Sequence, residues 1–137
     1  MPMRIITSLT IILSALTASA QLAVTVSPVK ATGQKAVVPL AMKNGFAEPI
    51  ESARAVCFLL DDQGKMIGQA TQWVIGGGRD KSPLATGATN AFNFVVAAAK
   101  PLTTTNLTTK VSFSRVVLAG GKLADPQKDV RIQAAEK

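Results

Sequence analysis

The sequence contains no histidine, no tyrosine and a single cysteine among its 137 residues. Histidine is the usual general base and the most frequent transition-metal ligand in proteins, so its absence removes Ser–His and Cys–His nucleophiles from the chain. One thiol is also too few for a closed zinc site. We therefore expect a protein that is not an enzyme, with no catalytic residues, no cofactor and no bound metal.

The lone cysteine, Cys57, cannot form a disulfide within the chain. It lies between Val56 and Phe58 in the most apolar segment of the predicted mature protein. A thiol in such surroundings usually behaves as a small buried hydrophobe, and this is the interpretation that we favour. A disulfide to another chain, or a reactive thiol, is the alternative.

Two further groups of residues raise the question of metal binding. Asp61-Asp62 precedes Gly64, and adjacent carboxylates on a tight turn point apart, so a turn is favoured over a Ca²⁺ site or an acid–base pair. Met42 and Met66 carry thioethers, which are soft ligands for Cu(I). Because the two methionines are isolated, we favour the interpretation that both fill gaps in the core.

The first 20 residues have the features of a signal peptide. Arg4 gives a positive start, residues 5–16 are mostly apolar, and the small residues 18–20 (Ala-Ser-Ala) match a signal-peptidase site. The apolar run is shorter than the about 20 residues that a membrane-spanning helix needs, so an uncleaved anchor is the less favoured alternative. We expect cleavage before Gln21 and export to the periplasm or the extracellular space.

The remaining chain has the length of one domain. Removal of 20 of the 137 residues leaves 117, which is enough to bury a core without disulfides. No later segment is apolar for long enough to cross a membrane. We therefore expect residues 21–137 to form a single soluble domain.

The formal net charge is +7, of which Arg4 in the predicted signal peptide contributes one. A basic balance attracts anionic partners such as lipopolysaccharide, acidic glycans, nucleic acid or anionic lipid. The other cations are spread evenly from Lys30 to Lys137, whereas a nucleic-acid surface needs clustered cations with stacking rings. We favour scattered solubilising charge and do not expect nucleic acid as a partner.

Apolar residues in the predicted mature chain recur at every second position, as in antiparallel sheets with one buried face. Phe92 and Phe94 alternate with Asn93, and Val111 and Phe113 alternate with serines. Turn residues separate such segments. The predicted strands are residues 22–27, 35–43, 53–61, 65–75, 89–97, 108–119 and 128–134. Their number and spacing predict an all-β fold, an immunoglobulin-like antiparallel β-sandwich of about seven strands.

Three details of these strands depend on single residues. After Arg115 the parity of the apolar residues changes, so we expect a β-bulge there. Pro39 has no amide donor and predicts an edge position or a bulge in the second strand. The third strand is apolar on both faces, and we favour its Val56, Phe58 and Leu60 as the inward side.

Several residues also follow the pattern of a known family. The pattern joins strand ends and turn residues: Asn44, Phe58-Leu59-Leu60-Asp61, Gly64, Trp73-Val74, Leu84-Ala85-Thr86-Gly87 and Phe92-Asn93-Phe94. Over roughly residues 35–97 the chain resembles the bacterial FxLYD-type domain. The resemblance implies an exported immunoglobulin-like sandwich, and it transfers no functional residue to this chain.

The Gly76–Pro83 segment contains three successive glycines followed by Arg79 and Lys81. The spacing of a phosphate-binding loop is absent. Sandwich domains often place recognition in loops, so Arg79 and Lys81 are candidate partner-binding residues. A simple mobile connection between the two sheets is the favoured alternative.

Together these features predict an exported, non-enzymatic β-sandwich module that interacts with an unidentified protein or glycan at the cell envelope. The alternative is an electrostatic binder of an anionic polymer such as lipopolysaccharide, an acidic glycan or nucleic acid. Salt-sensitive retention on a polyanion would distinguish the alternative from the first prediction.

Overall fold

The computed structural model describes residues 21–77, 82–102 and 106–135, so the predicted signal peptide lies outside the described residues. Within them the chain forms nine strands and one 3₁₀ turn. In chain order these are β1 (Leu22–Val26), β2 (Lys30–Thr32), β3 (Lys35–Asn44), β4 (Ile50–Leu60), β5 (Met66–Ile75), β6 (Thr89–Ala97), β7 (Thr108–Leu118), η2 (Ala119–Gly121), β8 (Leu123–Ala124) and β9 (Val130–Ala134). The described part of the chain has no helix with the length and hydropathy needed to span a bilayer.

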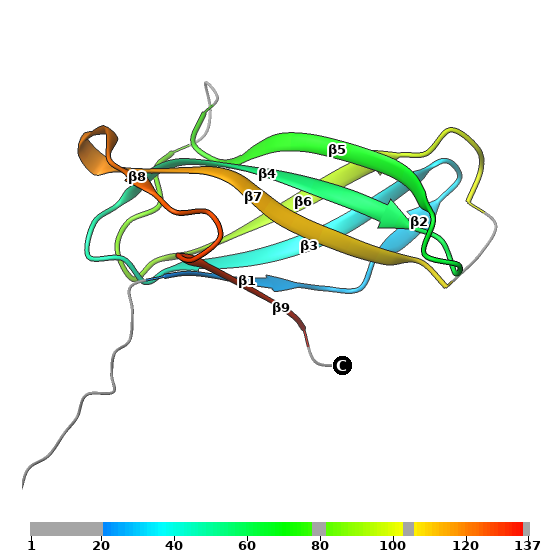
Figure 1. Ribbon diagram of the computed structural model, residues 1–137, viewed down its shortest axis with the longest axis horizontal. Helices are drawn as coiled ribbons and strands as arrows, with labels where there is room; N and C mark the ends of the chain where they lie inside the picture. Colours follow the sequence, from blue (N-terminus) through cyan, green and yellow to red (C-terminus); the bar gives the residue numbers. More distant parts are fainter. Residues whose placement is uncertain (1–20, 78–81, 103–105, 136–137) are drawn as a thin grey trace, which may run out of the picture.

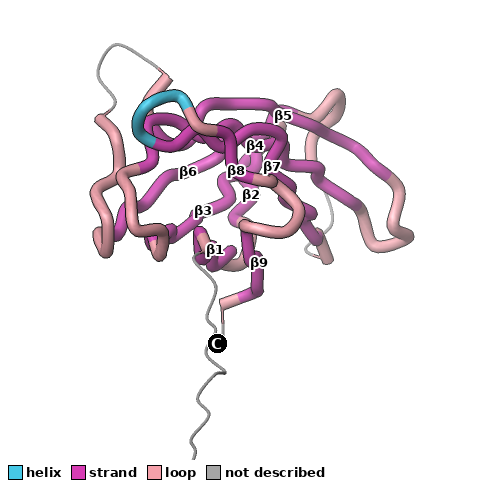
Figure 2. Tube along the Cα trace, turned by 60° about the vertical axis from the view of Figure 1, so that its left-hand side comes forward, coloured by secondary structure: helices cyan, strands magenta, loops and turns pink. Residues whose placement is uncertain are grey.

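The strands form two sheets that pack face to face (Figures 1 and 2). In the first sheet, β3 lies between β6 on one flank and β1 and β2 on the other, and β9 pairs with β1 in parallel. The second sheet has the order β5-β4-β7-β8 and is antiparallel throughout. The fold is the predicted immunoglobulin-like β-sandwich. All seven predicted strands are present; β2 and β8 were not predicted, because strands of three and two residues are too short to show alternation.

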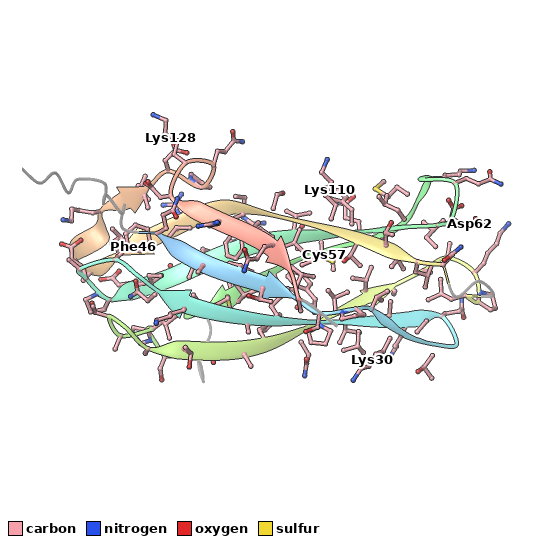
Figure 3. The ribbon with its side chains drawn as sticks, turned by 90° about the horizontal axis from the view of Figure 1, so that it is seen from below. Lys30, Phe46, Cys57, Asp62, Lys110 and Lys128 are labelled. Atoms are coloured by element: carbon pink, nitrogen blue, oxygen red, sulfur yellow. The ribbon has the colours of Figure 1, made fainter. Side chains whose placement is uncertain are left out.

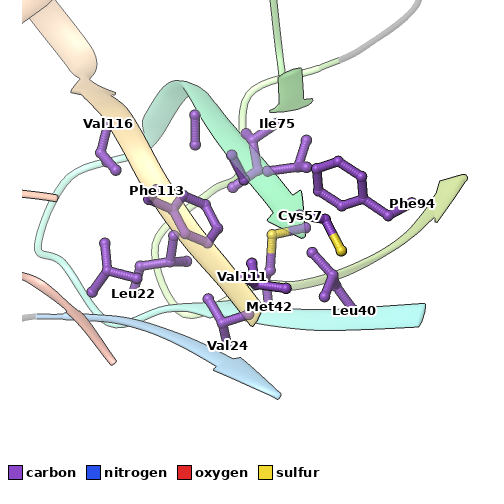
Figure 4. Packing of buried hydrophobic residues seen from close by; sticks show 14 of the residues in the cluster. Leu22, Val24, Leu40, Met42, Cys57, Ile75, Phe94, Val111, Phe113 and Val116 are labelled. Atoms are coloured by element: carbon purple, nitrogen blue, oxygen red, sulfur yellow. The ribbon is translucent and has the colours of Figure 1, made fainter. Parts of the chain in front are cut away.

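The core lies between the sheets and is built from the inward residues of the long strands (Figure 4). Phe94 is fully buried in β6, and the half-buried Phe92 meets it edge-on with ring centroids 5.5 Å apart. Val111 and Phe113 supply the buried side of β7. The predicted period of two and the inward phenylalanines of β6 and β7 are therefore confirmed.

The β-bulge predicted near Arg115 is present. Ala55 of β4 pairs with Phe113, and Arg54 pairs with Arg115, so Ser114 is the extra residue of β7. The Ser114 hydroxyl donates a hydrogen bond to the carbonyl oxygen of Arg54 at 3.3 Å. The extra residue changes the parity of β7, which allows Val116 beyond the bulge to face the core as well.

The orientation predicted for the third strand is wrong. The buried side chains of β4 are Ile50, Ala53, Ala55, Cys57 and Leu59. The predicted inward residues, Val56, Phe58 and Leu60, lie on the outer face of the sheet instead. In register, Ala55 pairs with Phe113, so a small inward residue of β4 leaves room for a large one of β7. Alternation could not reveal this, because the strand is apolar on both faces.

Pro39 lies at an interruption of the pairing on one flank of β3, in agreement with the predicted irregularity. The register of β3 with β6 runs from Lys35 to Lys43 without a shift, whereas on the opposite flank β1 pairs with Leu40–Asn44 and β2 with Lys35–Val37, with a shift of one residue between the two ladders. The Ser27 amide donates to the carbonyl oxygen of Pro39 at 2.9 Å, just after the end of β1. The missing amide of Pro39 therefore removes at most the last hydrogen bond of the β1–β3 ladder.

Asn44 is the one buried polar side chain among the described residues, and it ties together three segments of chain. Its Nδ2 donates to the carbonyl oxygens of Glu48 and Leu84, both at 2.9 Å, and its Oδ1 accepts from the Phe46 amide at 2.8 Å. The Gly87 amide donates to the Asn44 carbonyl oxygen at 2.8 Å. The side chain is thus fully used in joining the β3–β4 turn to the segment before β6.

On one long side of the sandwich, which we call the closed side, β5 of the second sheet meets β6 of the first. Gly68 forms an isolated bridge with Ala98. A Cβ at Gly68 would lie 3.0 Å from both the Ala97 carbonyl oxygen and Cγ1 of Val96. Glycine is therefore needed for this approach, and Phe94 behind the contact is 0% exposed.

On the other long side, which we call the open side, β7 and β9 belong to different sheets and do not pair with each other (Figure 1). β8 pairs only with Val116 and Val117 of β7. Among the described residues no strand pairs with the free flank of Thr108–Arg115. Phe113 and Val111 on this side keep 5% and 9% of their surfaces exposed.

Candidate binding face

The outer face of the second sheet combines cations with half-buried apolar side chains. β4 runs through its middle, β5 contributes an indole, and β7 contributes two cations. We call this surface the cationic face and define it by Arg54, Val56, Phe58, Leu60, Trp73, Lys110 and Arg115. These residues share one face because the side of β4 that was predicted to face the core faces outward instead.

Arg54 is at the centre of this face. It pairs in register with Trp73 of β5 on one flank and with Arg115 of β7 on the other. Its guanidinium carbon lies 5.9 Å from the centroid of the Trp73 ring, within the range of a cation–π contact. The register also sets Arg54 opposite Arg115 of β7, so two arginines extend from neighbouring strands on this face.

No carboxylate of the described residues forms an ion pair with Arg54 or Arg115. Strands β5 and β7 contain no Asp or Glu. Glu51, at the start of β4, accepts a hydrogen bond from the Gly120 amide at 3.1 Å. The ion pair that the described chain does form, between Lys122 Nζ and Glu48 Oε2 at 2.6 Å, lies outside the cationic face.

The apolar part of the face is a row along β4. Val56, Phe58 and Leu60 are each half-buried. Lys110 pairs in register with Phe58, and Figure 3 shows its side chain extending from β7 into solvent. A flat apolar strip flanked by cations and an indole can contact an extended ligand that carries both negative charge and apolar or sugar-ring surface.

The two predicted partner-binding residues, Arg79 and Lys81, lie outside the described residues. The glycines that precede them are described, and Gly77 has a φ of 76°. A Cβ at Gly77 would lie 2.5 Å from Cγ of Trp73, so the backbone packs against the indole at the edge of the cationic face. At this position glycine serves a close contact.

Asp61 forms a turn, as predicted. Its Oδ1 accepts from the amides of Gln63 and Lys65, both at 2.9 Å, and Gly64 completes the turn with a φ of 78°. The hydrogen bond from the Lys65 amide is the largest cause that lowers the pKa of the Asp61 carboxyl below its usual value. Among the described residues no three His, Cys, Asp or Glu side chains gather as metal ligands would.

Cys57 is unpaired and fully buried, as predicted. Burial raises the pKa of its thiol to about 11, which leaves very little reactive thiolate near neutral pH. Of the two methionines, Met42 is in the core as predicted, whereas Met66 is 53% exposed at the start of β5 and fills no gap. One thioether is therefore internal and the other external.

An open groove with a volume of about 760 Å³ lies at one end of the closed side. The turn before β5, the start of β5 and residues 98–102 line it. Asp62, Lys65 and Lys100 are exposed around it. The Asp61 carboxylate is held by the turn, so the groove presents no convergent set of functional groups.

The cationic face was not predicted, although part of its signal is visible in the sequence. Arg54 interrupts an apolar strand, and Arg115 stands at the predicted bulge. What the sequence did not provide was the register that sets Arg54 opposite Arg115 and beside Trp73. Register between distant strands depends on packing and turn geometry, not on either strand alone.

The sequence matches no protein-family model and no curated protein. The fold is similar to the crystal structure of a Bordetella pertussis protein assigned the name ApaA, with a TM-score of 0.52 and 18% sequence identity. The similarity covers 78% of this chain and 89% of that chain. At this identity the likeness shows the fold alone, an all-β sandwich.

Proposed function

We propose that the protein is an exported, non-enzymatic module that binds a protein or glycan at the cell envelope through the cationic face. The observation that supports this most strongly is the Arg54–Arg115 pair beside Trp73. Neither arginine forms an ion pair with a carboxylate of the described residues. A bound carboxylate, sulfate or phosphate would provide the partner that both lack.

The apolar strip supports a ligand that is more than a point charge. Val56, Phe58 and Leu60 are half-buried on the same face as the indole of Trp73. Aromatic and apolar side chains provide the contact area for sugar rings and for protein side chains. An acidic protein surface or an acidic glycan therefore fits the face better than a small anion.

The alternative function is electrostatic binding of an anionic polymer, such as lipopolysaccharide, an acidic glycan or nucleic acid. The absence of carboxylates from β5 and β7 favours it. Such binding weakens steeply with salt, because each neutralised charge releases a counterion. Retention on immobilised heparin that is lost at moderate salt would support this alternative.

The test compares two double variants of equal charge change. Arg54→Gln/Arg115→Gln alters the cationic face, and Lys35→Gln/Lys43→Gln alters exposed cations of β3 on the opposite sheet. Each protein is immobilised, incubated with envelope extract at physiological salt, and analysed by mass spectrometry. We expect a partner retained by the native protein and the β3 variant to be lost with the face variant. Equal retention by all three proteins would overturn the assignment of the face.

Export and family membership are proposed on the sequence features. Cleavage before Gln21 predicts that the intact mass of the exported protein corresponds to a chain starting there; a full-length mass would contradict it.

Membership of the FxLYD-type family is supported by the positions of Asn44, Leu84 and Gly87, which meet in one hydrogen-bonded connection.

A further inference from the structure

The free flank of β7 is an unpaired sheet edge in the part of the chain that is described. Beyond Val116 and Val117, which pair with β8, the Thr108–Arg115 stretch pairs with β4 on one flank only. The amide and carbonyl groups on its other flank have no strand partner among the described residues. Such an edge is a template for one more strand.

The apolar surface along this edge is incompletely covered. Val111, Phe113 and Val130 keep 9%, 5% and 9% of their surfaces exposed, whereas Phe94 and Val96 behind the closed side keep none. Ile132 of β9 is 37% exposed on the strand across from β7. An added strand with apolar side chains facing inward would cover these residues.

At the end of the same edge where β7 begins, a groove continues this apolar surface. Its volume is about 350 Å³, and apolar members of its lining include Val26, Val29, Leu107, Ile132 and Ala134. Leu107 immediately precedes β7, and Ile132 lies in β9. The groove thus connects β7 and β9 at the point where β7 begins.

The charges along the edge determine which partner fits. Lys110 and Arg115 project from the outer side of β7, Arg131 from β9, and neither strand contains a carboxylate. A second copy of this chain, with a net charge of +7, would bring like charges together along the two edges. A partner segment with acidic residues on its outer side would complement the cations.

We propose that the β7 edge accepts an extended segment of an acidic partner protein as an additional strand of the second sheet. Apolar residues of that segment would alternate with acidic ones, the former facing Val111 and Phe113, the latter Lys110 and Arg115. Backbone hydrogen bonds to β7 provide affinity, and the alternation provides selectivity. This inference rests on the proposed function only in taking a protein as the partner; it concerns the edge, not the middle of the face.

The test uses a ten-residue peptide, acetylated and amidated, that alternates valine and glutamate. Amide hydrogen exchange of the full mature protein is measured with and without the peptide, and affinity is measured by calorimetry. We expect exchange of edge amides within Thr108–Arg115 to slow at least about tenfold at saturation. Lys110→Glu/Arg115→Glu should weaken binding by about tenfold, Lys35→Glu/Lys43→Glu by less than about twofold.

Two matched peptides separate strand pairing from simple charge attraction. One carries N-methyl groups on every valine and the other on every glutamate, so each removes the amides of one edge of the peptide while composition stays the same. Only one edge of an added strand pairs with β7, so the affinities of the two peptides should differ by about tenfold or more. Equal affinities would overturn strand addition.

The remaining outcomes also discriminate. Binding without protection of β7 amides, together with sensitivity to Arg54→Gln, would overturn the edge and leave the proposed face intact. Absence of binding at millimolar peptide would overturn the inference, whereas the envelope-extract comparison tests the proposed function separately. Protection of β7 amides with insensitivity to Arg54→Gln supports strand addition.

Discussion

Along the closed side of the sandwich β5 and β6 touch through Gly68 and Ala97, whereas along the open side β7 and β9 diverge into different sheets. Phe94 behind the closed side is wholly buried, and Phe113 behind the open side is not. The core of the sandwich is therefore completely covered on the closed side and incompletely covered on the open side. The incomplete side is where an unpaired strand edge and the cations of β7 coincide.

The difference has a cause in the course of the chain. If β8 were as long as β7, it would pair with the whole free flank of β7. Here β8 pairs with only two residues of β7, and the chain then crosses to the first sheet as β9, where it pairs with β1. Pairing of β9 with β1 therefore leaves β7 exposed. The comparison can be tested by perturbing each side in turn.

The largest expected effect is the loss of a core ring. Phe94→Ala should lower the free energy of unfolding by about 3–5 kcal/mol, because a fully enclosed ring leaves a cavity. Phe113→Ala should cost about 1 kcal/mol less, because the open side can relax and admit water. Asn93→Ala, on the exposed face of β6, should change stability by less than about 1 kcal/mol. Urea unfolding measures all three, and equal losses for the two phenylalanines would remove the distinction between the sides.

A smaller loss of stability is expected when a side chain is introduced between β5 and β6 on the closed side. Gly68→Val introduces a side chain where a Cβ already meets backbone at 3.0 Å, so we expect a loss of about 1–3 kcal/mol. Thr71→Val, on the exposed face of the same strand, is the control and should be nearly neutral. If Gly68→Val proves equally neutral, the β5–β6 contact does not seal the sandwich.

The buried thiol reports on which side opens. With a pKa of about 11, native Cys57 should react slowly with a thiol reagent at pH 8 and rapidly in denaturant. Cys57 pairs with Val111, so Val111→Ala on the open side should accelerate labelling several-fold more than Val96→Ala on the closed side. Equal acceleration would mean that the thiol is reached only by global unfolding. A reducible dimer on a gel would contradict the assignment of a buried, unpaired thiol.

The smallest effect concerns the opposed arginines. Arg115→Gln should raise the free energy of unfolding by about 0.2–0.5 kcal/mol at low ionic strength, because it removes a like-charge pair. The gain should disappear in high salt, which screens exposed charges. Lys43→Gln, on the opposite sheet, should show no such gain. A loss of stability in Arg115→Gln would indicate that the side chain has a structural role and would weaken the case for a ligand.

Much of the fold was predictable because it depends on local patterns. The strands of residues 35–43 and 89–97 were recognised from alternation, and the bulge near Arg115 from a change of parity. The turn at Asp61 followed from its side chain's affinity for nearby amides. Each of these features is determined by a few residues that are neighbours in the sequence.

What could not be predicted depends on residues far apart. The inward side of β4 is decided by Phe113 on β7. The cationic face required the same long-range register, so the sequence drew attention to Arg79 and Lys81 instead of Arg54 and Arg115. Tertiary packing overrides local preference wherever a strand can present either face.

The parallel pairing of β1 with β9 has a consequence for the order in which the molecule can fold. Gln21, just before β1, donates from its side chain to the carbonyl oxygen of Lys128, a separation of 107 residues. Contacts that close such long loops form late and slow the folding of a domain. The first sheet therefore cannot be completed until β9, the last strand of the chain, has formed and paired with β1. For a chain exported as proposed, this delay would keep the polypeptide unfolded while it passes through a translocation channel.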